Sequence, residues 1–117
     1  MTRVRLALVA AVAVTALGLT VTAQAASTLT GTVGPGFTIG LTQGGKKVTT
    51  LKAGSYTITV ADKSNIHNFH LTGPGVNKST SVSATGSTTW KVTLKKGTYK
   101  FVCDPHASIM KGSFKVT

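Results

Sequence analysis

The sequence contains a single cysteine, Cys103, and therefore has no internal disulfide. Small domains outside the cytosol usually depend on disulfides, so a lone cysteine in such a domain needs another explanation. A free thiol in an oxidising compartment is vulnerable unless it is buried or bound to a metal. Cys103 is therefore the first residue whose role has to be identified.

Acidic residues are also scarce, since Asp62 and Asp104 stand against thirteen lysines and arginines. Both arginines lie within the first five residues, so residues 26–117 carry eleven lysines and a formal side-chain charge of +9. The dispersed lysines and the missing arginine argue against a nucleic-acid partner. We expect lysines on strand edges and loops to keep the protein soluble. If they are functional, they would attract an anionic protein partner or anionic envelope polymers.

The apolar run near the N-terminus, Leu6 to Leu19, has 14 residues and is too short for a membrane-spanning helix, which needs about 20. Two arginines precede this run, and the small-residue pattern Ala23-Gln24-Ala25 follows it, as in a secretory signal peptide. We therefore expect residues 1–25 to be a cleaved signal, with an uncleaved membrane anchor as the alternative. Residues 26–117 then form one exported domain, in the periplasm, at the cell envelope or outside the cell.

Helical periodicity is missing after residue 25, where short alternating runs are separated by glycine-containing turns. A Gly44-Gly45 turn leads into a strand from Lys46 to Leu51. The apolar sets that alternation assigns to the core are Phe37, Ile39 and Leu41; Tyr56, Ile58 and Val60; Trp90, Val92 and Leu94; Tyr99, Phe101 and Cys103; and Phe114 and Val116. We predict an all-β fold, a two-sheet antiparallel sandwich of seven or eight strands.

The segment from Cys103 to Met110 places a thiolate, an imidazole (His106) and a thioether on one short loop between two strands. With a second imidazole, these are the donors of a type 1 copper site, in which the methionine is a weak axial ligand. Singly, each residue has a structural explanation, as a buried small apolar side chain, an exposed loop histidine or a core methionine. Their order and close spacing in a chain with no other cysteine favour a metal site.

The second imidazole must come from His67 or His70. If the chain is extended there, His67 shares a face with Phe69 and Leu71, whereas His70 shares one with Asn68. The apolar face is the core face, so we predict His67 as the ligand and an outward-facing His70. A β-bulge between the two histidines would shift the register and could reverse this choice.

These motifs resemble the copper-binding pattern of the cupredoxins plastocyanin, pseudoazurin and amicyanin. The matching residues are Cys103-Asp104-Pro105-His106, Met110-Lys111-Gly112 and His67-Asn68, within a resemblance that covers about Gly54 to Thr117. The resemblance implies a cupredoxin-like Greek-key sandwich and one copper that carries single electrons. It also implies His67, Cys103, His106 and Met110 as the metal ligands, with His106 as the electron port.

The loop departs from this pattern in one respect. Three residues separate His106 from Met110, whereas plastocyanin and pseudoazurin have four and amicyanin has two. The length of the axial bond, and with it the redox potential, therefore does not follow from the resemblance.

We expect an electron carrier and not an enzyme, because the sequence has no paired carboxylates, no second histidine cluster and no nucleophilic triad. Asn68 and Asp104, each next to a predicted ligand, are expected to join the two ligand segments by hydrogen bonds. The expected partners are redox proteins with acidic surfaces, with no small-molecule substrate, and the expected state is a monomer. The alternatives are a copper chaperone or storage protein, a metal-free envelope-binding sandwich, and a zinc site with the same donors.

Overall fold

The computed structural model describes residues 10–18 and 27–117. The predicted cleavage site at Ala23-Gln24-Ala25 lies outside the described residues. Residues 10–18, within the predicted signal, are exposed and belong to neither a helix nor a strand. No helix among the described residues has both the length and the apolar character needed to cross a membrane.

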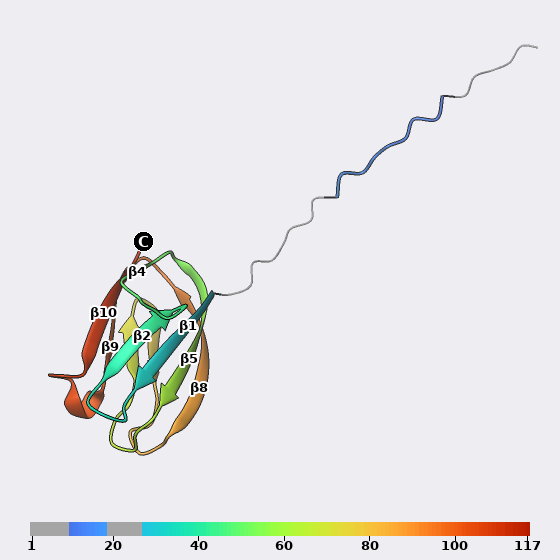
Figure 1. Ribbon diagram of the computed structural model, residues 1–117. Coiled ribbons are helices and arrows are strands. Elements are labelled where there is room, and N and C mark those ends of the chain that lie inside the picture. The colour runs from blue at the N-terminus through green and yellow to red at the C-terminus, as the bar shows by residue number, and fades with distance from the viewer. Residues whose placement is uncertain (1–9, 19–26) are drawn as a thin grey trace, which may run out of the picture.

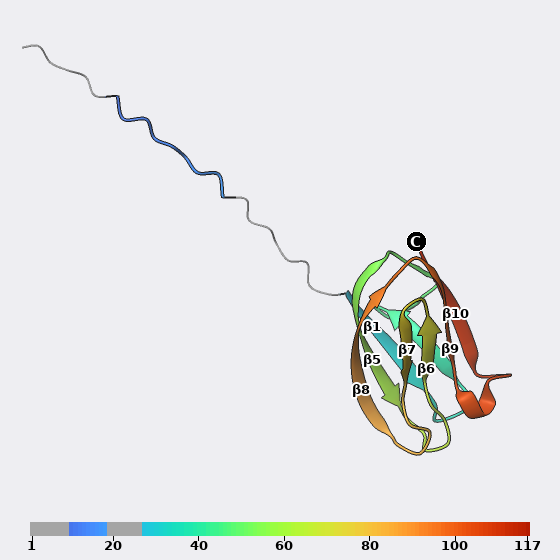
Figure 2. The same ribbon diagram turned by 180° about the vertical axis from the view of Figure 1, so that it is seen from behind.

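The described chain folds into two five-stranded sheets packed face to face (Figures 1 and 2). The first sheet has the order β3-β2-β1-β5-β8 and the second β4-β10-β9-β6-β7. The elements are β1 (Ser27–Val33), β2 (Ile39–Gln43), β3 (Lys46–Lys47), β4 (Thr50–Leu51), β5 (Gly54–Asp62), β6 (His70–Gly73), β7 (Val76–Ser79), β8 (Gly86–Leu94), β9 (Gly97–Val102), the 3₁₀ helix η1 (Asp104–His106) and β10 (Lys111–Val116). The prediction of an all-β sandwich is confirmed.

Two details of the predicted fold are wrong. The sheets are mixed and not purely antiparallel, because β1 runs parallel to β5 and β4 runs parallel to β10. There are ten strands among the described residues, because the predicted strand Lys46–Leu51 is two short strands that pair with β2 and with β10. This segment crosses from one sheet to the other, and local alternation carries no information about which sheet a strand joins.

The core is built from the inward faces of both sheets, as alternation predicts. Ile58, Val60 and Tyr99 have no exposed surface, and Trp90 is 9% exposed. Phe69 stacks on Phe101 with ring centroids 5.4 Å apart, which adds a favourable aromatic pair to the buried area.

Phe37 is the exception to the predicted core. Its side chain is 58% exposed, and the residue precedes β2 instead of belonging to it. The Gly34 N–H donates to the Thr38 carbonyl over 2.9 Å and closes a tight loop around Phe37. Because the loop interrupts the strand, the alternation that assigns Phe37 to the core does not extend to it.

Candidate metal centre

Three donor atoms from two distant segments converge at one end of the sandwich. The Nδ1 atoms of His67 and His106 lie 3.0 Å apart, and the Sγ atom of Cys103 lies 3.7 Å from the first and 3.6 Å from the second. A point in the plane of the three atoms lies about 2 Å from each, close to the length of a bond from a metal ion to an imidazole nitrogen. Among the described residues this is the only group of three or more His, Cys, Asp or Glu side chains close enough to hold a metal ion.

The C-terminal donors are held by a hydrogen-bonded loop after β9. The Cys103 N–H donates to the Met110 carbonyl over 3.0 Å and closes the loop at its base. Within it, the Cys103 carbonyl accepts from the His106 N–H at 3.0 Å, and the His106 carbonyl accepts from the Met110 N–H at 2.8 Å. Pro105 lies in the first turn of η1, where its missing N–H costs no hydrogen bond. The turn thereby brings His106 to the side of Cys103.

The donors differ in their access to solvent. His67 and Cys103 are fully buried, and His106 is half-buried. The Nε2 atom of His67 is the only buried side-chain nitrogen or oxygen of the described chain without a hydrogen-bond partner. All polar contacts of the His67 ring are therefore made by Nδ1, which faces the other two donors. This donor set fits a type 1 copper.

The structure brings together three of the four predicted ligands through their donor atoms. The fourth, Met110, is buried in the same loop, and its carbonyl is bonded to the N–H of Cys103. Its role as the axial ligand stays a prediction. His70 lies at the start of β6, outside the donor cluster, and is partly exposed.

Asn68 joins the two ligand segments, as the sequence predicts. Its side-chain amide donates to Asp104 Oδ2 over 2.8 Å, and its Oδ1 accepts from the Asp104 N–H over 2.7 Å. Its backbone N–H donates to the sulfur of Cys103 over 3.4 Å. Alternation places Asn68 on the outward face, but the side chain is only 3% exposed, because residues 63–69 form a loop before β6.

His70 and Asp104 form an ion pair next to the site, and this pairing shifts the pKa of both side chains. His70 donates through Nδ1 to Asp104 over 2.8 Å, and its Nε2 is hydrogen-bonded to Asn77 Oδ1 over 2.7 Å. The hydrogen bond to Asp104, followed by that to Asn77, raises the pKa of His70 above its ordinary value. Partial burial alone would raise the pKa of Asp104, but the hydrogen bonds from Asn68 and His70 outweigh it and lower that pKa.

Phe37 is a site residue that sequence analysis missed. Its ring meets the imidazoles of His67 and His106 edge-on, with centroid distances of 5.1 and 5.0 Å. The only signal in the sequence is the turn Gly34-Pro35-Gly36 directly before it, which ends the alternation expected of a strand. The loop between β1 and β2 is thus a third segment of the site.

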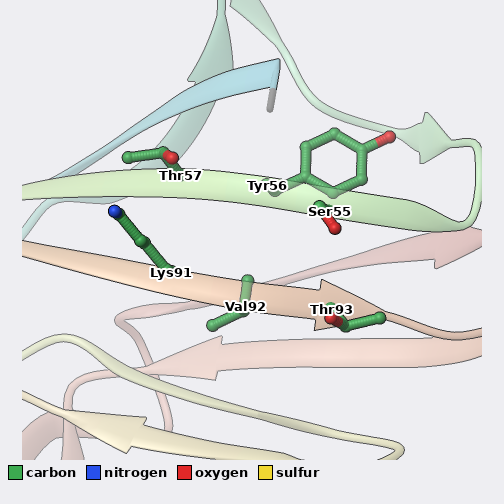
Figure 3. Close-up of a pocket in the computed structure, with 6 residues that line it drawn as sticks. All are labelled: Ser55, Tyr56, Thr57, Lys91, Val92 and Thr93. Atoms are coloured by element: carbon green, nitrogen blue, oxygen red, sulfur yellow. The ribbon is translucent and has the colours of Figure 1, made fainter. Parts of the chain in front are cut away.

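A separate hollow of about 410 Å³ lies over β5 and β8 (Figure 3). Its lining consists of Ser55, Tyr56, Thr57, Lys91, Val92 and Thr93. It contains none of the metal-donor residues and no acidic side chain, so it is not part of the metal centre.

Comparisons with known proteins agree with this geometry. Residues 38–117 match the sequence model of a protein family, the copper-binding proteins of the plastocyanin/azurin family. No curated protein sequence matches the chain. The fold is similar to that of a rusticyanin variant, at 23% identity over 77% of this chain and 76% of that chain, with a TM-score of 0.57.

Two further solved structures have the same fold. Reduced auracyanin from Roseiflexus castenholzii is 23% identical over 80% of this chain and 99% of that chain, with a TM-score of 0.56. Rusticyanin from Thiobacillus ferrooxidans is 24% identical over 77% of this chain and 76% of that chain, with a TM-score of 0.53. Since the family match covers most of the sequence and includes all three donors, the chain belongs to the plastocyanin/azurin family of copper-binding proteins.

Proposed function

We propose that this protein is an exported electron carrier with one type 1 copper, bound by His67, Cys103 and His106 and by Met110 as the axial ligand. The observation that carries the proposal is the convergence of two Nδ1 atoms and one Sγ atom. Bound copper supplies a one-electron couple at such a site. The residues of the chain hold the donors in place and exclude water.

Two features of the site support electron transfer. The donors converge on a hydrogen-bonded loop and a buried imidazole, so they need little movement when the charge at the site changes. Of the three donors shown, only His106 reaches the surface, which makes its ring the shortest route for an electron to a partner.

The test is to add Cu(II) to the purified protein and to record its visible spectrum. We expect an intense blue thiolate-to-copper band that Cys103→Ser abolishes. A correctly folded protein that binds copper without this band would contradict the proposal, and preferential binding of zinc would favour the zinc alternative.

A copper chaperone or storage protein would use similar donors but would release the metal quickly. Burial of His67 and Cys103 argues for slow exchange and therefore for a carrier. Slow loss of copper to a mild chelator and a reversible voltammetric wave are expected. Rapid loss without such a wave would favour copper handling.

We also propose that the partner presents an acidic surface to a monomeric carrier. Lys78, Lys91 and Lys95 line a groove of about 380 Å³ between the edge strands β7 and β8. Neither aspartate of the sequence neutralises this groove, because Asp62 is buried and Asp104 is paired with His70. Electron transfer to an acidic partner should slow as ionic strength rises, and Lys78→Glu should slow it at low salt. Rates independent of salt would contradict this proposal.

The proposal of export and of a non-enzymatic role rests on the sequence. Residues 1–25 have the pattern of a signal peptide, and the chain contains only two carboxylate side chains. Determining the N-terminal residue of the protein recovered from the cell envelope or medium tests export, with Ala26 as the expected first residue. Full-length protein in the cytosol would contradict it.

A further inference from the structure

His70 has no assigned role at the metal site, yet both of its ring nitrogens are fixed. Nδ1 lies 2.8 Å from Asp104 Oδ1 and 3.1 Å from Oδ2, and Nε2 lies 2.7 Å from Asn77 Oδ1. The Asp104 carboxylate can only accept, so Nδ1 donates to it, while Nε2 is hydrogen-bonded to the Asn77 side chain. A half-buried imidazole is thereby held rigidly between β7 and the metal loop.

Asp104 transmits this constraint to Asn68. The Oδ1 atom of the carboxylate accepts from His70, and its Oδ2 atom accepts from the Asn68 side chain over 2.8 Å. Asn68 returns a hydrogen bond, since its Oδ1 accepts from the Asp104 N–H over 2.7 Å. The Thr80 carbonyl is a second, weaker anchor for Asn68, at 3.4 Å. His70 therefore acts on a residue that is already partly restrained.

Asn68 in turn contacts the sulfur of Cys103. Its backbone N–H donates to Sγ over 3.4 Å and is the only backbone donor to this atom among the described residues. Hydrogen bonding around the cysteine sulfur is one of the factors that set the redox potential of a type 1 copper. The position of this one N–H therefore matters for the metal.

We propose that His70 is a positioning residue, which holds the Asn68 N–H against the sulfur of Cys103 through Asp104. The proposal rests on the proposed copper site and adds to it a residue that binds no metal. It explains why a second histidine lies three residues after His67 and pairs with the residue that follows Cys103.

The test compares three variants in the metal-free and the copper-loaded protein. His70→Phe keeps a ring and removes both hydrogen bonds, His70→Gln keeps a donor toward Asp104, and Thr72→Val is a control on the same face of β6. In the reduced metal-free protein, His70→Phe should move the Asn68 amide proton resonance upfield as its bond to sulfur lengthens. In the copper-loaded protein it should lower the reduction potential, because the sulfur becomes a stronger donor to Cu(II).

If His70→Gln restores the Asn68 amide resonance and the reduction potential, the effect of His70→Phe comes from lost positioning and not from lost charge, since glutamine is neutral. That result would support the proposal. Unchanged signals in His70→Phe relative to Thr72→Val would overturn the proposal. If His70→Phe does not fold, Asn77→Ala takes its place, with a smaller shift in the same direction expected and no shift contradicting the proposal. The amide resonance needs no copper, so failure of the copper assignment is seen separately, as a wild-type protein without the blue band.

Discussion

Single side chains at the metal centre have separate tasks. His67 supplies a buried donor, His106 supplies one near the surface, and Phe37 covers both rings from outside. Phe37 is 58% exposed, so burial alone does not explain its position. Its ring makes two edge-on contacts with imidazoles, and we expect these contacts to restrain both histidines.

Phe37→Ala is expected to speed the loss of copper to a chelator by about tenfold, since each edge-on aromatic contact contributes about 0.5–1.5 kcal/mol. Stopped-flow measurement of the decay of the blue band checks this. Ile109→Ala is the control, because Ile109 is an exposed apolar side chain of the Cys103–Met110 loop, next to the site, and makes no such contact with the imidazoles. Equal rates in the two variants would show that Phe37 does not restrain the histidines.

The His70–Asp104 pair predicts a pH dependence of stability. The pKa of His70 is raised in the folded protein, so its contribution is complete below the unfolded value of 6.5 and is lost as pH rises through the raised value. The lowered pKa of Asp104 gives a contribution that is present above 3.8 and is lost as pH falls through the lowered value. Because both side chains are partly exposed, we expect a change of only about 0.2–1 kcal/mol for the pair.

Denaturant unfolding of the metal-free protein at pH 6 and pH 9, compared with His70→Phe, measures the histidine contribution. The wild type should lose more stability than the variant over this interval. The same loss in both proteins would mean that the pair does not contribute.

At the scale of the elements, glycines let aromatic rings lie flat across neighbouring strands. Gly112 of β10 pairs with Phe101 of β9, and a Cβ at residue 112 would overlap the Phe101 ring. A Cβ at Gly73, at the end of β6, would likewise overlap the Tyr99 ring. Since Phe101 also stacks on Phe69, the residue after Asn68, this packing lies directly behind the metal site.

Gly112→Ala is expected to destabilise the protein by about 1–3 kcal/mol, because the added methyl group overpacks the sheet against Phe101. Gly40→Ala on β2 is the control, since its Cβ would meet no atom within 4 Å. Denaturant unfolding of both variants checks the prediction. Similar free energies of unfolding for the two would contradict the overpacking argument.

At the scale of the whole molecule, the hydrophobic core of the sandwich does not depend on a bound metal. Most of the buried apolar side chains belong to the two inner sheet faces, and Tyr99, Ile58 and Leu94 have almost no exposed surface. The donors are added at one end, through the loop after β9 and the loop before β6. We therefore expect the metal-free protein to be folded.

Copper should nevertheless raise the melting temperature. Binding to the folded state alone adds about 4 kcal/mol when free copper exceeds the Kd a thousandfold, a shift on the order of 20 °C for a domain of this size. Calorimetry with and without copper measures it, with Cys103→Ser as the control that should show a much smaller rise. A metal-free protein without a cooperative transition would contradict the view that the core is independent.

Local pattern in the sequence is enough to predict the sandwich, most of its core and the loop that carries Cys103 and His106. Tyr56, Ile58 and Val60 alternate along one strand, and alternation within a strand needs no knowledge of its neighbours. Cys103 and His106 are close because few residues separate them, so their spacing alone places them together. The preference for His67 over His70 agrees with the cluster that the structure forms, although the residues before His70 are a loop and the condition of an extended strand, on which the preference rests, is not met.

Only the tertiary structure decided which distant segments meet. Three features join parts of the chain that have no local pattern in common. They are the parallel pairing of β1 with β5, the passage of residues 46–51 between the sheets and the contact of Phe37 with both imidazoles. The same holds for the bonds from His70 through Asp104 and Asn68 to the sulfur of Cys103. The sequence alone determined which donor atoms are available for a metal, because donor chemistry belongs to single residues. Their arrangement and their hydrogen-bond partners depend on long-range packing, which no short stretch of sequence encodes.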